Sequence, residues 1–166
     1  AFLDKRRASW AAQADLEQGR WLAREGGVAI LGVSSASDRA SQRAMRGLLN
    51  RGLQCTPVSS TVQEVLGLRC LKTLGDVTGP LPALLSVFCD SADVDTEMVK
   101  LLDEAVSMAP RGVRGLWLPS KTAGSAGLSG AVARARASGL LVVSGPCFAE
   151  DVEKWPARGQ GRNASR

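Results

Sequence analysis

The amino-acid sequence predicts a doubly wound α/β domain, in which a parallel sheet of about five strands is covered by helices on both faces. Three observations predict it. Short apolar runs rich in Val, Ile and Leu alternate with longer helical patterns along the chain. The first of these runs, "VAILGV" (28–33), is continuous and β-branched and does not alternate with polar residues, as expected for a strand that is buried on both sides. The length of 166 residues, with 45% hydrophobic and 22% charged residues, fits one globular domain.

A helix is predicted at the start of the chain, before the first apolar run. Trp10, Ala14 and Trp21 lie near one face of this helix, Ser9 is a candidate cap, and Gly26-Gly27 ends it. Residues 1–27 are therefore expected to form an N-terminal helix and extension that leads into the first strand.

Strands and helices then alternate to the end of the sheet. The predicted strands are "VAILGV" (28–33), "LQCTPV" (53–58), a brief strand near 68–71, "ALLSVFC" (83–89), "VRGLWLP" (113–119) and "GLLVVSG" (139–145). The helices between them are predicted at about 40–50, at about 95–108 and within 126–139. The domain is therefore placed at residues 28–150, followed by a polar C-terminal tail at 151–166.

The loop after the first strand has the composition of an anion site. Gly32 permits a tight backbone turn, Ser34 offers a hydroxyl, and Arg39 and Arg43 supply positive charge beside the start of a helix. The alternative is an ordinary strand-to-helix loop in which Ser41 caps the helix.

Familiar nucleotide motifs are missing from this loop. It has no Gly-x-Gly-x-x-Gly, and no acidic residue follows the second strand in "PVSST", which argues against NAD. The lysine of a P-loop is also missing, which argues against a nucleoside triphosphate.

Composition excludes several classes of function. The net charge of +5 is spread along the chain and Tyr is absent, so the domain itself is not expected to bind nucleic acid, and no apolar run approaches the roughly 20 residues of a membrane span. Without His or Tyr, the sequence offers no catalytic constellation and no ordinary zinc site, so neither an enzyme nor a metal site is expected. The four cysteines lack Cys-x-x-Cys spacing and are interpreted as reduced, small hydrophobic residues, with disulfides as the alternative.

The order of motifs over residues 15–150 resembles the small CoA-binding domain family. These are Rossmann-like single-domain proteins related to the nucleotide-binding domain of the succinyl-CoA synthetase α subunit. The motifs that carry the resemblance are Gly32-Val33-Ser34, Asp38-Arg39-Ala40-Ser41, Pro57-Val58, Glu64-Val65-Leu66-Gly67, Val87-Phe88, Trp117 and Cys147. The resemblance implies that CoA phosphates lie at Gly32, Val33, Ser34, Arg39 and Ser41, and that the adenine end lies near Pro57, Val58, Val87 and Phe88.

The chain departs from the family pattern after several strands. Ser59-Ser60 replaces Asn-Pro, Cys89-Asp90 replaces basic or amide residues, and Gly145-Pro146 replaces Asp-Arg. After Trp117, Leu118-Pro119-Ser120-Lys121 stands where the family has Gln and Gly.

Two hypotheses of function follow from the resemblance and the departures. One is a non-catalytic protein that binds CoA or a related nucleotide. The other is a degenerate CoA-binding fold that serves as an accessory structural subunit of a large, mitochondrial assembly, such as a respiratory complex or a ribosome, with other subunits bound through the N- and C-terminal extensions. The start "AFLDKRR" contains an acid and does not itself resemble a transit peptide. A mitochondrial-matrix location is expected if such a peptide has been removed, and a cytoplasmic location otherwise.

Overall fold

A five-stranded parallel sheet forms the centre of the protein. The computed structural model describes residues 2–89, 94–119, 122 and 125–156, and of residues 2–9 and 94 only the backbone. The strands follow the spatial order β2-β1-β5-β6-β7, and all four neighbouring pairs are parallel. Their bounds are Val28–Leu31 (β1), Cys55–Val58 (β2), Leu84–Val87 (β5), Gly115–Trp117 (β6) and Leu141–Val143 (β7). The doubly wound α/β fold predicted from the sequence is confirmed.

A short hairpin replaces most of the predicted strand near 68–71. Strands β3 (Glu64–Val65) and β4 (Leu68–Arg69) pair antiparallel. The turn between them contains Leu66 at φ 50° and Gly67 at φ 78°, and two positive φ angles are typical of a tight hairpin turn. Leu71 then forms one parallel bridge with Val58, so a rudiment of a sixth strand lies beside β2.

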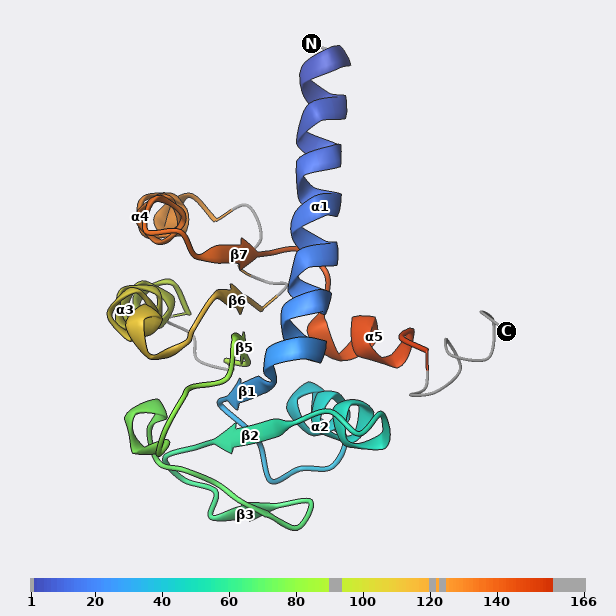
Figure 1. Ribbon diagram of the computed structural model, residues 1–166, viewed down its shortest axis with the longest axis vertical. Helices are drawn as coiled ribbons and strands as arrows, with labels where there is room; N and C mark the ends of the chain where they lie inside the picture. The colour runs from blue at the N-terminus through green and yellow to red at the C-terminus, as the bar shows by residue number, and fades with distance from the viewer. Residues whose placement is uncertain (1, 90–93, 120–121, 123–124, 157–166) are drawn as a thin grey trace.

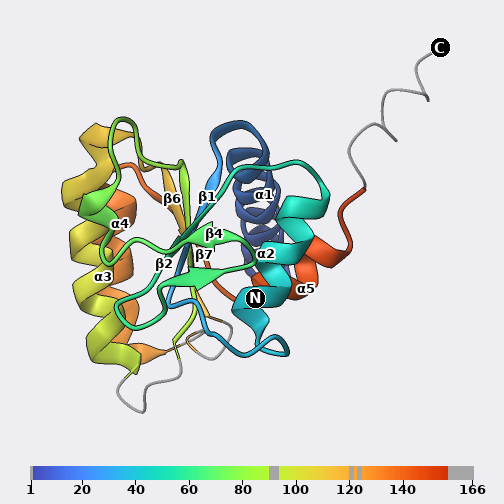
Figure 2. The ribbon, with the colours of Figure 1, turned by 90° about the horizontal axis from the view of Figure 1, so that it is seen from below.

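The helices cover the sheet in two layers (Figure 1, Figure 2). Helices α3 (Val94–Met108) and α4 (Ser129–Ala137) lie on one face. Helices α1 (Phe2–Gly26), α2 (Ala40–Asn50) and α5 (Phe148–Glu153) lie on the other. Three short 3-10 turns complete the described elements, at Leu74–Asp76, Ala109–Arg111 and Ala126–Leu128.

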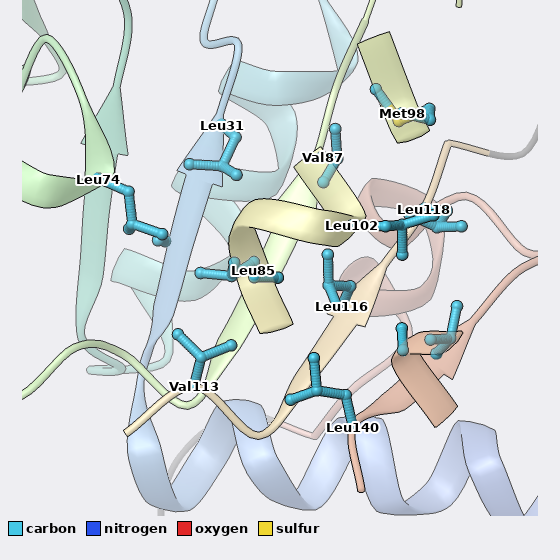
Figure 3. Close-up of a cluster of buried hydrophobic side chains, with 14 of the residues drawn as sticks. Leu31, Leu74, Leu85, Val87, Met98, Leu102, Val113, Leu116, Leu118 and Leu140 are labelled. Atoms are coloured by element: carbon cyan, nitrogen blue, oxygen red, sulfur yellow. The ribbon is translucent and has the colours of Figure 1, made fainter. Parts of the chain in front are cut away.

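Each face of the sheet has its own hydrophobic core, because successive side chains of a strand point to opposite sides. Below α3 and α4, Leu85 and Leu116 of the sheet pack with Leu102 of α3, as Figure 3 shows. On the other side, Ile30 and Trp117 pack with residues of α1, α2 and α5.

Helix α1 packs on the sheet through the face opposite to its tryptophans. Gly19 lies so close to the sheet that a Cβ there would be 3.2 Å from the ring of Trp117, and Leu22 is buried. Trp10 and Trp21, which the sequence placed near one helical face, are 64% and 55% exposed. The N-terminal half of α1 extends away from the sheet (Figure 1). None of the described helices combines the length and the apolar character that a membrane crossing requires.

The folded domain continues beyond residue 150, where the sequence placed its end. That boundary falls inside α5, whose last residue is Glu153. Asp151 is buried and binds Arg20 of α1 through both carboxylate oxygens at 2.7 and 2.9 Å, and it also accepts the indole N–H of Trp155 at 2.7 Å. The polar composition of the segment gave no sign that it belongs to the folded domain. It is held there by one ion pair and one tryptophan. The rest of the expected tail, 157–166, lies outside the described residues.

Candidate functional site

Two clefts open at the carboxyl edge of the sheet, beside β1 and β5. The chain passes from β1 into α2 on one face and from β5 toward α3 on the other, so this edge is a topological switch point, where ligands of doubly wound folds bind. The larger cleft has a volume of about 610 Å³ and the smaller one about 240 Å³. Both are lined by Gly32, Ser34, Phe88 and Cys89, so they adjoin one another.

A glycine is required at position 32, directly after β1. Its φ is 81°, and a Cβ there would overlap the carbonyl oxygen of Phe88. Phe88 is held in place because its N–H donates to the carbonyl of Leu31 at 2.9 Å, and the N–H of Gly32 donates to Val58 at 3.1 Å. The end of β1 therefore turns against the end of β5 with bare backbone facing both clefts.

Hydrogen bonds fix the loop between Gly32 and α2. The N–H of Ser34 donates to Ser41 Oγ at 3.0 Å, and the side-chain amide of Gln42 donates to the Ser34 carbonyl at 3.0 Å. The N–H of Ala36 donates to Ser34 Oγ at 3.1 Å. Both serine hydroxyls thus accept a backbone N–H, and each has its own O–H to donate to a ligand.

Ser41 does not cap α2, as the alternative interpretation of the loop assumed. Arg39 occupies the N-cap position, and its side chain makes no capping hydrogen bond. The side chain of Ser41 instead binds the loop, as described above. The first N–H groups of any helix lack acceptors within the helix, and they carry partial positive charge. At α2 they lie beside the smaller cleft, which Arg39, Ala40 and Ser41 line.

The three arginines near the start of α2 have different roles. Arg39 lines the smaller cleft. Arg43, which the sequence suggested as a second phosphate ligand, forms a two-pronged ion pair with Glu153 of α5, with both N···O distances 3.0 Å. Arg46 donates to the carbonyl of Ser37 at 2.8 Å. The expectation for Arg43 is wrong because its side chain extends toward α5, one helical turn beyond the cleft.

The larger cleft combines an apolar floor with a polar rim. The floor consists of aliphatic side chains from the sheet, from the 3-10 turn at Leu74–Asp76 and from α3: Leu31, Val58, Leu74, Leu85, Leu101 and Ala105. Hydroxyl groups of Ser59, Ser60, Thr61 and Thr73 line the side near β2. Among the described residues, its charged lining groups are Lys72, Glu97 and Glu104. The thiol of Cys89 donates to Glu97 Oε2 at 3.0 Å.

The structure brings most of the predicted ligand residues together. Val33, Val58 and Phe88 line the larger cleft, and Val87 and Phe88 line the smaller one. Pro57 is the exception, because it is buried within β2 and is not among the residues that line either cleft. Its carbonyl accepts the N–H of Leu71 at 3.0 Å, so its role is in the sheet.

Sequence reasoning missed the wall that α3 contributes. Glu97, Leu101 and Glu104 recur at helical spacing and form a stripe beside the buried Met98 and Leu102. The spacing was a usable signal that they share a face. Asp90, Ser120 and Lys121, where the sequence departs from the family pattern, lie outside the described residues.

The four cysteines divide between the core and the clefts. Cys55 and Cys70 belong to the core under α1, α2 and α5, and burial raises the pKa of the Cys55 thiol to about 12. Cys89 and Cys147 line the smaller cleft. None of the four forms a disulfide in the described part of the chain. Within the described part of the chain, no group of three His, Cys, Asp or Glu residues is placed to hold a metal ion.

Comparison with known protein families identifies the fold. A family model described as "CoA binding domain" matches residues 27–151. The chain belongs to this CoA-binding domain family. This CoA-binding domain is also 30% identical over 61 residues to the uncharacterized protein YneT of Bacillus subtilis, a stretch that covers 37% of the chain and 44% of YneT. The chain thus matches less than half the length of that relative.

Solved structures share the fold of this CoA-binding domain at low sequence identity. A hypothetical protein from Pyrococcus horikoshii OT3 superposes with a TM-score of 0.67 at 22% identity, over 84% of this chain and 90% of that one. The protein "cell-free ID.343" from Thermus thermophilus gives 0.64 at 22% identity, over 84% and 97%. The dinucleotide-forming acetyl-coenzyme A synthetase 1 of Ca. Korarchaeum cryptofilum gives 0.60 at 18% identity, over 75% of this chain and 27% of that one. These likenesses show the fold.

Proposed function

We propose that this chain binds coenzyme A, or a closely related nucleotide, and performs no chemistry on it. The observation that carries the proposal is the arrangement around the start of α2. The bare turn at Gly32 and the neighbouring Ser34 line both clefts, and Arg39 and Ser41 line the smaller cleft beside them. Membership of the CoA binding domain family supports the choice of ligand.

The diphosphate of the ligand would lie at the start of α2. There it accepts hydrogen bonds from the first N–H groups of the helix and from the two serine hydroxyls, while Arg39 contributes charge. The two ends of the nucleotide then extend into the two clefts, which adjoin at Gly32 and Ser34.

A non-catalytic role is proposed because the residue types needed for common group transfers are missing. The chain has no His and no Tyr. Acyl and phosphoryl transfers that pass through a side chain depend on such groups or on an activated nucleophile. The partly buried thiol of Cys55, whose pKa is raised to about 12, stays protonated at neutral pH and is a poor nucleophile.

Calorimetric titration with CoA tests the proposal. The unmodified protein is expected to bind CoA with a dissociation constant in the micromolar range. Arg39→Ala is expected to weaken binding about tenfold, because it removes a charge-assisted contact to phosphate. Arg134→Ala is the matched control, because Arg134 is an exposed arginine of α4 that is not among the residues lining either cleft. Absence of binding to the unmodified protein, or equal weakening by both variants, would contradict the proposal.

A role as an accessory subunit is a second candidate, favoured by α1. Trp10 and Trp21 are both largely exposed, on a helix whose first half extends away from the sheet. Exposed tryptophans of this kind are frequent anchors of protein interfaces. Complexes purified natively from the source cells through a tagged chain are expected to lose a stoichiometric partner in Trp10→Ser/Trp21→Ser. Recovery of the chain alone, without any such partner, would contradict this candidate. The mitochondrial location stays a prediction.

A further inference from the structure

We propose that the larger cleft selects nucleotides whose adenosine carries no additional phosphate, so that 3′-dephospho-CoA binds more tightly than CoA. The inference rests on the proposed function and specifies its ligand. CoA and 3′-dephospho-CoA differ only by the phosphate on the ribose 3′ oxygen. The discrimination arises from the carboxylates of Glu97 and Glu104 on α3.

The adenosine half of the ligand belongs in the larger cleft because of its size and position. The smaller cleft, at about 240 Å³, is below the usual range of about 300–1,000 Å³ for ligand pockets, whereas the larger one, at about 610 Å³, lies within it. In doubly wound folds the ribose lies beyond the end of the second strand. Here Ser59, Ser60 and Thr61 follow β2 and line the larger cleft. Its aliphatic floor suits an adenine ring.

The charges that line the larger cleft give it a negative balance. Glu97 and Glu104 lie two helical turns apart on α3, with Leu101 between them on the same stripe. Lys72 is the cation among the described lining residues and offsets one carboxylate. Arg69 is not among the residues that line this cleft; it lines an adjoining groove, together with Asp76, and the two hollows share residues 59–62 and Lys72.

The two clefts therefore favour opposite charges. The start of α2 and Arg39 attract the diphosphate beside the smaller cleft. In the larger cleft, carboxylate oxygens accept hydrogen bonds from ribose hydroxyls and from the amino group of adenine. A 3′-phosphate replaces one ribose hydroxyl donor by a dianion and brings that negative charge toward the two carboxylates. At least one carboxylate then loses its hydrogen bond to the ribose. The carboxylates are exposed, so screening by solvent limits the repulsion to a moderate effect.

Titration with matched ligands tests the inference. At low salt the unmodified protein is expected to bind 3′-dephospho-CoA about three- to tenfold more tightly than CoA, and the ratio is expected to shrink as salt is added. In E97Q/E104Q the ratio is expected to approach one, mainly through tighter binding of CoA. Glutamine keeps an acceptor for the Cys89 thiol, so the variant preserves that contact.

Asp103→Asn is the control, since it removes one carboxylate from the same helix at an exposed position that is not among the residues lining the cleft. It is expected to leave the ratio unchanged. Tighter or equal binding of CoA by the unmodified protein overturns the inference while the proposed function stands. A ratio that E97Q/E104Q leaves unchanged, or that D103N shifts equally, also overturns it. If neither ligand binds, the proposed function fails and the inference fails with it.

Discussion

Replacing Gly32 by alanine tests whether the bare turn after β1 is essential to the site. Two effects act on the variant. Alanine at φ 81° carries a backbone penalty of about 1–2 kcal/mol, and its Cβ overlaps the carbonyl oxygen of Phe88. Relieving such an overlap in packed structure costs about 1–3 kcal/mol. The free energy of unfolding is therefore expected to fall by about 2–5 kcal/mol.

Gly67→Ala separates the two effects, because Gly67 has nearly the same φ, 78°, but nothing lies within 4 Å of an added Cβ. This control is expected to lose only the backbone penalty of about 1–2 kcal/mol. Urea denaturation followed by circular dichroism gives both free energies. The gain from a smaller unfolded ensemble, which alanine brings in place of glycine, is common to both variants and cancels in their difference.

The excess loss in Gly32→Ala over Gly67→Ala measures the close approach of β1 to Phe88. Affinity for CoA, measured well below the melting temperature, is expected to fall in Gly32→Ala and to stay unchanged in Gly67→Ala. Equal destabilisation of the two variants would refute the argument that Phe88 demands a glycine. Undiminished affinity in folded Gly32→Ala would refute the placement of phosphate at this turn.

Two further predictions concern stability. Asp151→Ala removes, from a buried position, the acceptor of both Arg20 and the Trp155 indole, and it is expected to lower the free energy of unfolding in urea by about 3–5 kcal/mol. Glu153→Ala breaks an exposed ion pair and is expected to lower it by only about 0.2–1 kcal/mol. Equal losses in the two variants would contradict this prediction. Above pH 9 the Cys55 thiol ionises in the unfolded chain, but in the folded protein it stays protonated because its pKa is raised to about 12. This thiol therefore lowers the free energy of unfolding by up to about 1.4 kcal/mol for each pH unit above 9. The slope above pH 9 is expected to be flatter in Cys55→Ala, and parallel slopes would contradict the assignment.

The elements that could be predicted from the sequence are those with a local signal. The helix expected at about 40–50 is observed at Ala40–Asn50, because Gly52, at φ 69°, ends it. The five central strands lie within the apolar runs that predicted them, although each is shorter than its run. The strand near 68–71 depended on pairing with a neighbouring strand of the sheet, and of this segment Leu71 forms a bridge with β2.

The candidate site divides in the same way. Gly32, Ser34, Arg39 and Ser41 come from one continuous segment, so a strand, a turn and a helix start were enough to bring them together. The role of Ser41 as the acceptor of a loop N–H was not predictable, since either a cap or a loop contact satisfies the same hydroxyl. Arg43 was misplaced because its partner lies on α5, 110 residues away.

The wall of the larger cleft depends on contacts between distant segments and could not be predicted. Loop residues after β2 face α3 across it, and their separation is set by how α3 packs on the sheet through Met98 and Leu102. Substitutions among the residues of this wall can therefore change its charge and polarity without disturbing the segment that turns at Gly32. The residues that resemble the family pattern around α2 form the anion-attracting loop, whereas Ser59 and Ser60, which depart from it, line the cleft assigned to adenosine. A chain built in this way can retain its affinity for a diphosphate while its preference among nucleotides changes.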